Sequence, residues 1–159
     1  MELDFRGEII PNLQLTASYA FIDSRNSGYA FAGVYSASTN GYELSGYPRD
    51  RLFGVARNGG SVWGTYRFAP GAFGGLKLGA GAVIRGTREG DNINDYQLPG
   101  CVKVNTMAAY GWRAAGTQMS IQLNVDNLFD KRYFESLSGT RTVMPGSPRR
   151  WIASLRVDF

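Results

Sequence analysis

The chain has 159 residues, a length that fits either one compact domain or a fragment of a larger one. It contains 21 Gly and 13% aromatic residues, a mixture that favours an all-β protein over a helical one. The net charge of +4 is spread along the sequence without a basic stripe, so no nucleic acid is expected as a partner.

Seven segments alternate apolar and polar side chains with a period of two, which is typical of strands with two different faces. In chain order they are Glu2 to Ile9, Leu13 to Phe21, Ser61 to Phe68, Leu76 to Thr87, Val102 to Trp112, Gln118 to Asn127, and Arg149 to Phe159. Most of them approach the length of about 9–11 residues that a tilted strand needs to cross a bilayer.

The connections between these segments alternate strictly between short and long. The short ones are Pro11 to Asn12, Ala69 to Gly74 and Arg113 to Thr117; the long ones are Asp23 to Gly60, Glu89 to Gly100 and Leu128 to Pro148. Transmembrane barrels have tight periplasmic turns and extended outer loops, whereas a soluble sandwich has no reason to separate its loops by end. The sequence therefore predicts antiparallel transmembrane β-barrel strands in a bacterial outer membrane, in contact with outer-membrane lipid.

Aromatic residues gather at the two ends of the predicted apolar band. With the short turns in the periplasm, Tyr66, Phe68, Tyr110, Trp112 and Phe159 fall at one end, and Tyr19, Phe21, Phe129 and Trp151 at the other. Amphipathic rings prefer the two membrane interfaces. Bacterial barrels have an even strand count, so seven strands indicate a piece of a larger barrel. The N-terminal segment also lacks the order of a signal peptide, so we expect the true N-terminus to lie upstream.

Four stretches of the sequence resemble one family of outer-membrane proteins. The run from Asn124 to Tyr133, with Asn124, Asn127, Leu128, Phe129, Asp130 and Tyr133 as its matching residues, is similar to the N-x-x-N-L-F-D-x-x-Y signature of TonB-dependent receptors. Gly146 to Phe159 resembles the final strand of that family, Trp63 to Phe68 its W-x-T-Y-x-F strand, and Pro11 to Ala20 one of its turns and strands. The pattern looks most like that of the ferric-siderophore receptors.

This resemblance implies a fold and a function for the whole protein. Such receptors carry an N-terminal plug inside a 22-stranded barrel, of which this chain would supply strands sixteen to twenty-two, the C-terminal third. The implied function is outer-membrane uptake of a ferric siderophore, driven by the TonB complex through an N-terminal region absent from this sequence. Iron would be carried inside the siderophore, and protein side chains would bind no cofactor.

The first long connection holds the candidate ligand-binding residues. Tyr and Arg side chains can stack on, hydrogen-bond to and neutralise a bulky, anionic siderophore complex. The candidates are Tyr29, Tyr35, Tyr42, Arg49 and Arg51. The alternative is an outer loop whose aromatic residues pack among themselves.

Two further groups of residues have expected roles near the end of the chain. Asn124, Asp126, Asn127 and Asp130 offer oxygen ligands for calcium but lack the Gly and Glu of an EF-hand loop. We therefore favour a structural role, with these side chains facing the lumen or shaping the exit from the strand, and expect no metal site. The resemblance implies that Trp151, Leu155, Val157 and Phe159 form the signal recognised by the barrel-assembly machinery. Lys77, Arg85, Lys103, Arg150 and Arg156 are expected to face the lumen, where pairing with carboxylates of the plug or of neighbouring strands is favoured over guiding anions.

Two rival functions remain open at the level of the sequence. The first is a small self-contained barrel acting as a pore or adhesin, with an eighth strand in Arg51 to Arg57 and a turn at Asn58 to Gly60. The second is a membrane-barrel enzyme. The chain has no His and only Cys101, which excludes an internal disulfide, a Cys/His metal site and a Ser-His or Cys-His pair, so we expect no catalytic residues.

Overall fold

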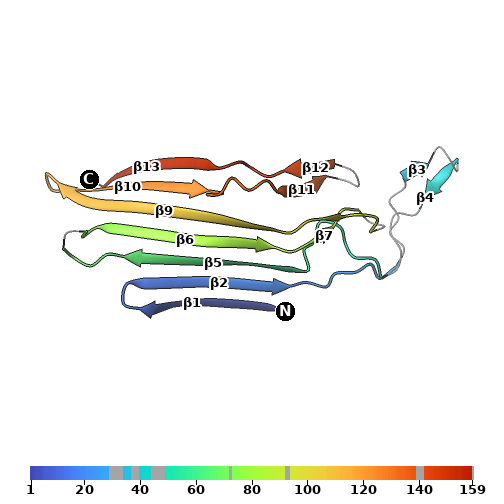
Figure 1. Ribbon diagram of the computed structural model, residues 1–159, viewed down its shortest axis with the longest axis horizontal. Helices are drawn as coiled ribbons and strands as arrows, with labels where there is room; N and C mark the ends of the chain where they lie inside the picture. The colour runs from blue at the N-terminus through green and yellow to red at the C-terminus, as the bar shows by residue number, and fades with distance from the viewer. Residues whose placement is uncertain are drawn as a thin grey trace.

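The computed structural model describes residues 1–28, 34–36, 40–43, 49–71, 73–91, 94–138 and 142–158. Its main feature is one seven-stranded sheet in which every strand is antiparallel to its neighbours (Figure 1). The strands are β1 (Glu2–Ile10), β2 (Leu13–Phe21), β5 (Asn58–Arg67), β6 (Leu76–Arg85), β9 (Cys101–Ala114), β10 (Thr117–Asp126) and β13 (Arg150–Asp158). Their order in the sheet follows the sequence, which makes the sheet a meander. The seven predicted strands are thus confirmed.

Three small hairpins occupy the long connections. They are formed by β3 (Val34–Ser36) with β4 (Gly41–Glu43), β7 (Arg88–Glu89) with β8 (Gln97–Leu98), and β11 (Phe134–Ser138) with β12 (Thr142–Pro145). These stretches were predicted to be loops, because strands of two to five residues are too short for an alternating pattern to stand out. Figure 1 shows the long connections at one end of the sheet and the short turns at the other.

The eighth strand of the pore or adhesin alternative is not formed. Between Arg51 and Arg57 the structure has only an isolated bridge, which joins Arg51 to Arg25. The proposed turn at Asn58 to Gly60 is instead the start of β5, paired with the end of β2 on one side and of β6 on the other. A Cβ at Gly60 would fall against the Ser18 carbonyl oxygen, so the glycine lets β5 run close to β2. That alternative was therefore wrong.

The strand register gives the sheet two chemically different faces. On the first, called the outer face here, Leu123 lies between Ala108 and Ala153, and Ile121 between Tyr110 and Leu155. On the second, the lumenal face, Gln122 pairs with Ser154, Ser120 with Arg156, and Asp126 with Arg150. The register also places the five predicted lumenal cations, Lys77, Arg85, Lys103, Arg150 and Arg156, on this face, as expected.

The outer face leaves large apolar side chains uncovered. Leu155 is 66% exposed, Trp151 60% and Ile121 48%. Among the described residues only two apolar side chains, Leu98 and Val125, are fully buried. A water-soluble sheet would cover such a face with another layer, whereas a membrane-spanning sheet turns it toward lipid.

The lumenal face has a tightly packed centre around Trp63 of β5. This indole covers Gly79 and Gly81 of β6, where a Cβ at Gly79 would lie 2.8 Å from its ring and 3.3 Å from the Met107 methyl group. The Trp63 Nε1–H donates a hydrogen bond to Thr65 Oγ1 at 2.9 Å. The two glycines thus create the space that the ring fills.

Aromatic rings cluster at the end of the sheet with the short turns. Tyr110 and Trp112 stack with ring centroids 6.0 Å apart, and Tyr66 meets Phe68 edge-on at 5.0 Å. At the opposite end, Arg57 lies over the Phe21 ring, 5.0 Å from its centroid. Two aromatic bands thus lie at the two ends of the apolar face. Phe159, assigned to the first band, lies outside the described residues.

Candidate functional site

Asn127 anchors the exit from β10. Its side chain is 1% exposed; the Nδ2 group donates to the carbonyls of Lys131 at 3.0 Å and Ser147 at 3.1 Å, while Oδ1 accepts from the Lys131 amide at 2.8 Å. The Asn127 amide in turn donates to Asn105 Oδ1 of β9 at 2.9 Å. Its φ of 53° lies in the left-handed region, which Asn tolerates better than most residues. Asn127 therefore joins both ends of the third long connection to the sheet.

The other residues of the Asn124–Tyr133 motif lie in different surroundings from one another. The Asp130 carboxylate accepts a hydrogen bond from the Arg149 amide at 2.8 Å, while Asn124 Oδ1 accepts one from Gln122 on the lumenal face at 2.9 Å. Leu128 borders the outer face, and Phe129 is 73% exposed. Asn127 and Asp130 thus shape the strand exit, in line with the structural role predicted for them. Within the described residues, no group of three or more His, Cys, Asp and Glu side chains is placed to hold a metal ion.

A charged cluster lies where β6 and β11 meet. The Arg85 guanidinium donates to the Glu135 carbonyl at 2.7 Å and lies 3.3 Å from the Glu135 carboxylate. Arg88 donates to the carbonyls of Phe134 at 2.7 Å and Glu135 at 3.3 Å. The two arginines therefore hold the β11 hairpin against the end of β6. We call Arg85, Arg88, Lys103, Tyr133 and Glu135 the basic cluster.

Tyr133 completes this cluster from the end of the motif. Its hydroxyl lies 3.5 Å from the Lys103 ammonium group, which sits 5.4 Å from the Tyr133 ring centroid. The ring packs against Gly146, where a Cβ would overlap it, and the Gly146 amide donates to the Tyr133 carbonyl at 2.8 Å. Tyr133 is thus fixed between the base of the third long connection and the lumenal wall.

The surroundings lower the pKa of both Glu135 and Arg88 in the basic cluster, which favours the charged form of Glu135 and disfavours that of Arg88. Burial acts to raise the pKa of Glu135, but the hydrogen bond from Tyr133 and the charges of Arg85 and Lys103 outweigh it and lower the pKa. Burial and, after it, the neighbouring Arg85 charge lower the pKa of Arg88. Glu135 is the carboxylate that interacts electrostatically with all three cations.

Of the predicted ligand-binding residues, Arg49 and Arg51 have contacts that the structure describes. Arg51 pairs with Asp23 at 2.9 Å, and Asn94 holds the Arg51 amide at 2.9 Å and the Arg51 carbonyl at 3.0 Å. Arg49 has a φ of 77°, and its amide donates to the Asn26 carbonyl at 2.9 Å. Tyr35 and Tyr42 are backbone register partners in the β3–β4 hairpin, and Tyr29 lies outside the described residues. The ligand-binding role of these residues stays a prediction.

Sequence reasoning did not single out Arg88, Glu135 or Asn94. Arg88 and Glu135 are 47 residues apart and meet only because the second and third long connections pack against each other. One feature of the sequence could have pointed to the basic cluster. The alternation of β6 places Arg85 on the lumenal face, and Arg88 follows three residues later.

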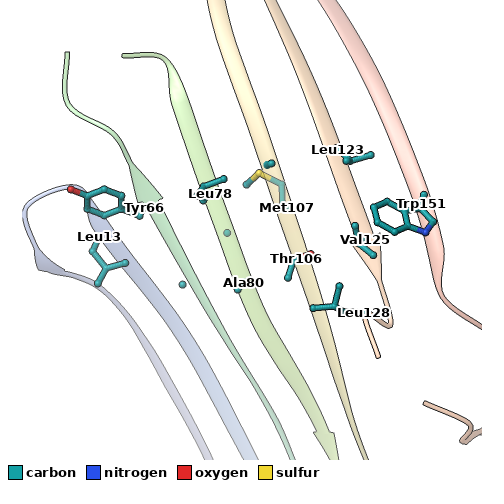
Figure 2. A pocket seen from close by; sticks show the side chains of 13 residues that line it. Leu13, Tyr66, Leu78, Ala80, Thr106, Met107, Leu123, Val125, Leu128 and Trp151 are labelled. Carbon is teal, nitrogen blue, oxygen red and sulfur yellow. The ribbon is translucent and has the colours of Figure 1, made fainter. Parts of the chain in front are cut away.

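The outer face contains a shallow apolar hollow of about 710 Å³ that spans β2 to β13 (Figure 2). Its lining includes the small residues Gly64, Ala80 and Ala108, and Tyr66 and Trp151 stand at opposite sides. A hollow lined in this way suits the acyl chains of lipids.

The predicted assembly signal lies partly on this face. Trp151, Leu155 and Val157 share one side of β13, opposite Val125, Ile121 and Met119 of β10. Phe159, the last member of the signal, lies outside the described residues. Recognition by the assembly machinery stays a prediction.

In the part of the chain that the structure describes, no helix is long and apolar enough to span a membrane.

An uncovered apolar face, a polar lumenal face and loops segregated to one end together define part of the wall of an outer-membrane β-barrel. A family model described as "TonB dependent receptor-like, beta-barrel" matches residues 1–128. The chain belongs to this family of outer-membrane transport receptors.

Individual relatives support the same assignment. The chain is 30% identical over 159 residues to the metal-pseudopaline receptor CntO of Pseudomonas aeruginosa strain PAO1, covering 99% of the chain and 20% of that protein. It is 32% identical over 133 residues to the probable TonB-dependent siderophore receptor PiuA of Acinetobacter baumannii, covering 84% of the chain and 17% of that protein. The chain thus spans about a fifth of the length of these relatives.

Solved structures show the same fold. The ferric preacinetobactin receptor BauA of Acinetobacter baumannii superposes with a TM-score of 0.81 at 18% identity, covering 99% of the chain and 21% of that receptor. The siderophore receptor PiuA of the same species gives a TM-score of 0.74 at 25% identity, covering 98% of the chain and 20% of that receptor.

Proposed function

We propose that the chain is part of the barrel of an outer-membrane receptor that imports a ferric siderophore with energy from the TonB complex. The observation that carries the proposal is the two-faced sheet: its outer face exposes Leu155, Trp151 and other apolar residues, while its lumenal face carries arginines and amides. Such a wall suits a passage for a large polar solute through lipid. The named relatives, which include a metal-pseudopaline receptor and a probable siderophore receptor, supply the ligand class.

The edges of the sheet support a larger barrel. In an antiparallel meander of seven strands the first and last, β1 and β13, run in the same direction, so pairing them directly would break the antiparallel pattern. Backbone groups left open at either edge would be costly in lipid. We therefore assign the chain to the C-terminal third of a 22-stranded plugged barrel, whose other strands close the wall.

The remaining partners follow from this assignment. Outer-membrane lipid contacts the outer face, the TonB complex engages the receptor through a region outside this chain, and the barrel-assembly machinery inserts it. Iron arrives inside the siderophore, so no cofactor is bound by protein side chains. The receptor moves its ligand without making or breaking a covalent bond and is therefore not an enzyme.

Deletion of the gene for the full-length receptor tests this function. In iron-limited medium, the deletion strain should lose uptake of radioactive iron supplied as the cognate siderophore complex, and the full-length gene should restore it. Because transport is coupled to TonB, a strain without TonB should show the same loss. Uptake that persists without TonB, or no uptake defect with any ferric siderophore tested, would contradict the proposal.

A further inference from the structure

The basic cluster holds more positive charge than its own carboxylate balances. Arg85, Arg88 and Lys103 all influence the single acidic side chain of the cluster, Glu135. The side chains of Arg85 and Glu135 are 34% and 48% exposed, so this pair is accessible to solvent. A cluster with three cations and one anion attracts further negative charge.

The buried Arg88 guanidinium has a nitrogen without a hydrogen-bond acceptor among the described residues. Arg88 is 3% exposed, and its Nη2 group donates hydrogen bonds to the carbonyls of Phe134 and Glu135. Its Nη1 group is buried and has no hydrogen-bond partner within the described residues. A buried guanidinium with an unmade hydrogen bond is costly, and a negatively charged acceptor would offset that cost best.

The surroundings of Arg88 provide room for such an acceptor. Arg85, Arg88 and Glu135 border a hollow of about 490 Å³ at the loop end of the sheet, closed on its other side by Phe53 to Ala56 and Leu137. Arg85 belongs to the lumenal face, the side along which a solute would pass. The volume is large enough for a carboxylate-bearing arm of a metal chelate.

We propose that this hollow binds a carboxylate of an anionic metal chelate, with Arg85 as the accessible contact and Arg88 as the deeper one. The inference rests on the proposed receptor function and narrows its ligand to chelates that present carboxylates. A guanidinium matches a carboxylate in shape and charge, and two adjacent guanidinium groups select against neutral hydroxamate chelates, which bring no charge to neutralise. Lys103 adds positive charge at the edge of the cluster, and Tyr133 orients the Lys103 ammonium group.

Binding to the purified full-length receptor tests this assignment. The probes are ferric citrate, rich in carboxylates, and ferrichrome, a neutral hydroxamate complex, titrated against wild-type protein and the variants Arg88→Met and Arg85→Gln. Each variant should weaken ferric citrate binding by about 10- to 100-fold, the worth of one charge-assisted hydrogen bond. Arg156→Gln is the matched control: this arginine lies on the same face at the opposite end of the sheet, is paired with Asp158, and should leave binding unchanged.

The outcomes separate the inference from the function on which it rests. Wild-type receptor that binds ferrichrome but not ferric citrate overturns the carboxylate site and leaves the receptor function standing. Variants that both bind ferric citrate as tightly as the wild type do the same. Absence of both binding and uptake for every iron chelate overturns the receptor function itself. Arg88→Met can fail to fold; heat-modifiable migration on gels reveals this, and the more exposed Arg85→Gln then decides. A variant that loses thermal stability without losing citrate affinity identifies a carboxylate of the receptor as the occupant and also overturns the inference.

Discussion

Replacing Asn127 with alanine should lower the free energy of unfolding by about 2–4 kcal/mol, because it removes three hydrogen bonds from a site that water does not reach. The carbonyls of Lys131 and Ser147 would lose their donor, and the Lys131 amide its acceptor. Alanine also adopts a left-handed backbone conformation, here a φ of 53°, at a higher energy than asparagine does. Urea unfolding of the full-length protein in lipid vesicles measures the loss.

The motif provides the matched control for Asn127. Asn124→Ala removes a side chain of the same type that makes a single lumenal hydrogen bond, with Gln122, and should cost less than about 1 kcal/mol. Asn127→Asp keeps the acceptor oxygen but loses the Nδ2 donor to two carbonyls, so it should destabilise nearly as much as alanine. Equal stability of the Asn127→Ala and Asn124→Ala proteins would show that Asn127 does not anchor the strand exit.

Replacing Gly81 with valine should cost about 3 kcal/mol and reduce the yield of folded barrel, because no side chain fits beneath Trp63. A Cβ at Gly81 would overlap the Trp63 ring and the Val62 carbonyl oxygen, which belongs to backbone and cannot turn away. The indole would have to leave the lumenal wall, losing its contact with Gly79 and its hydrogen bond to Thr65. Heat-modifiable gel migration reports the folded fraction.

Gly64 of the neighbouring strand β5 offers the comparison for Gly81 of β6. It lies on the outer face, where a new Cβ would find its nearest neighbours at 3.9 Å, an ordinary contact distance. Gly64→Ala should therefore fold like the wild type. If the Gly81→Val protein folded equally well, Trp63 would not be packed on the glycines as described.

The seven long strands could be predicted from the sequence because each has two chemically different faces. Strand β10 places Met119 and Ile121 toward lipid and Ser120 and Gln122 toward the lumen, and this alternation is visible without any knowledge of its neighbours. The three hairpins were missed because strands as short as β7 cannot display a period. The β7–β8 hairpin is contacted from a distant connection, because the Gly54 amide donates a hydrogen bond to the Glu89 carbonyl.

The site was harder to predict than the fold because its residues are close only in space. Asn127 was found through its motif, and the structural role predicted for it matches its contacts. Arg51 was predicted to bind ligand because of its charge, yet its guanidinium pairs with Asp23 and its backbone amide donates to Asn94. Asn94 is 43 residues away in the sequence, so no local pattern indicates this contact. The buried state of Arg88 likewise follows from the packing of β11, which the sequence does not reveal.

The most direct test of the membrane-wall account is a spin-label accessibility scan along β13, from Trp151 to Asp158, in full-length protein inserted in lipid vesicles. Labels at Trp151, Ala153, Leu155 and Val157 should be reached by oxygen dissolved in the lipid, and labels at Ile152, Ser154, Arg156 and Asp158 should not. This alternation is expected because the register turns the first set toward lipid and the second toward the lumen. Uniform access to a water-soluble relaxation agent along the strand would contradict the account.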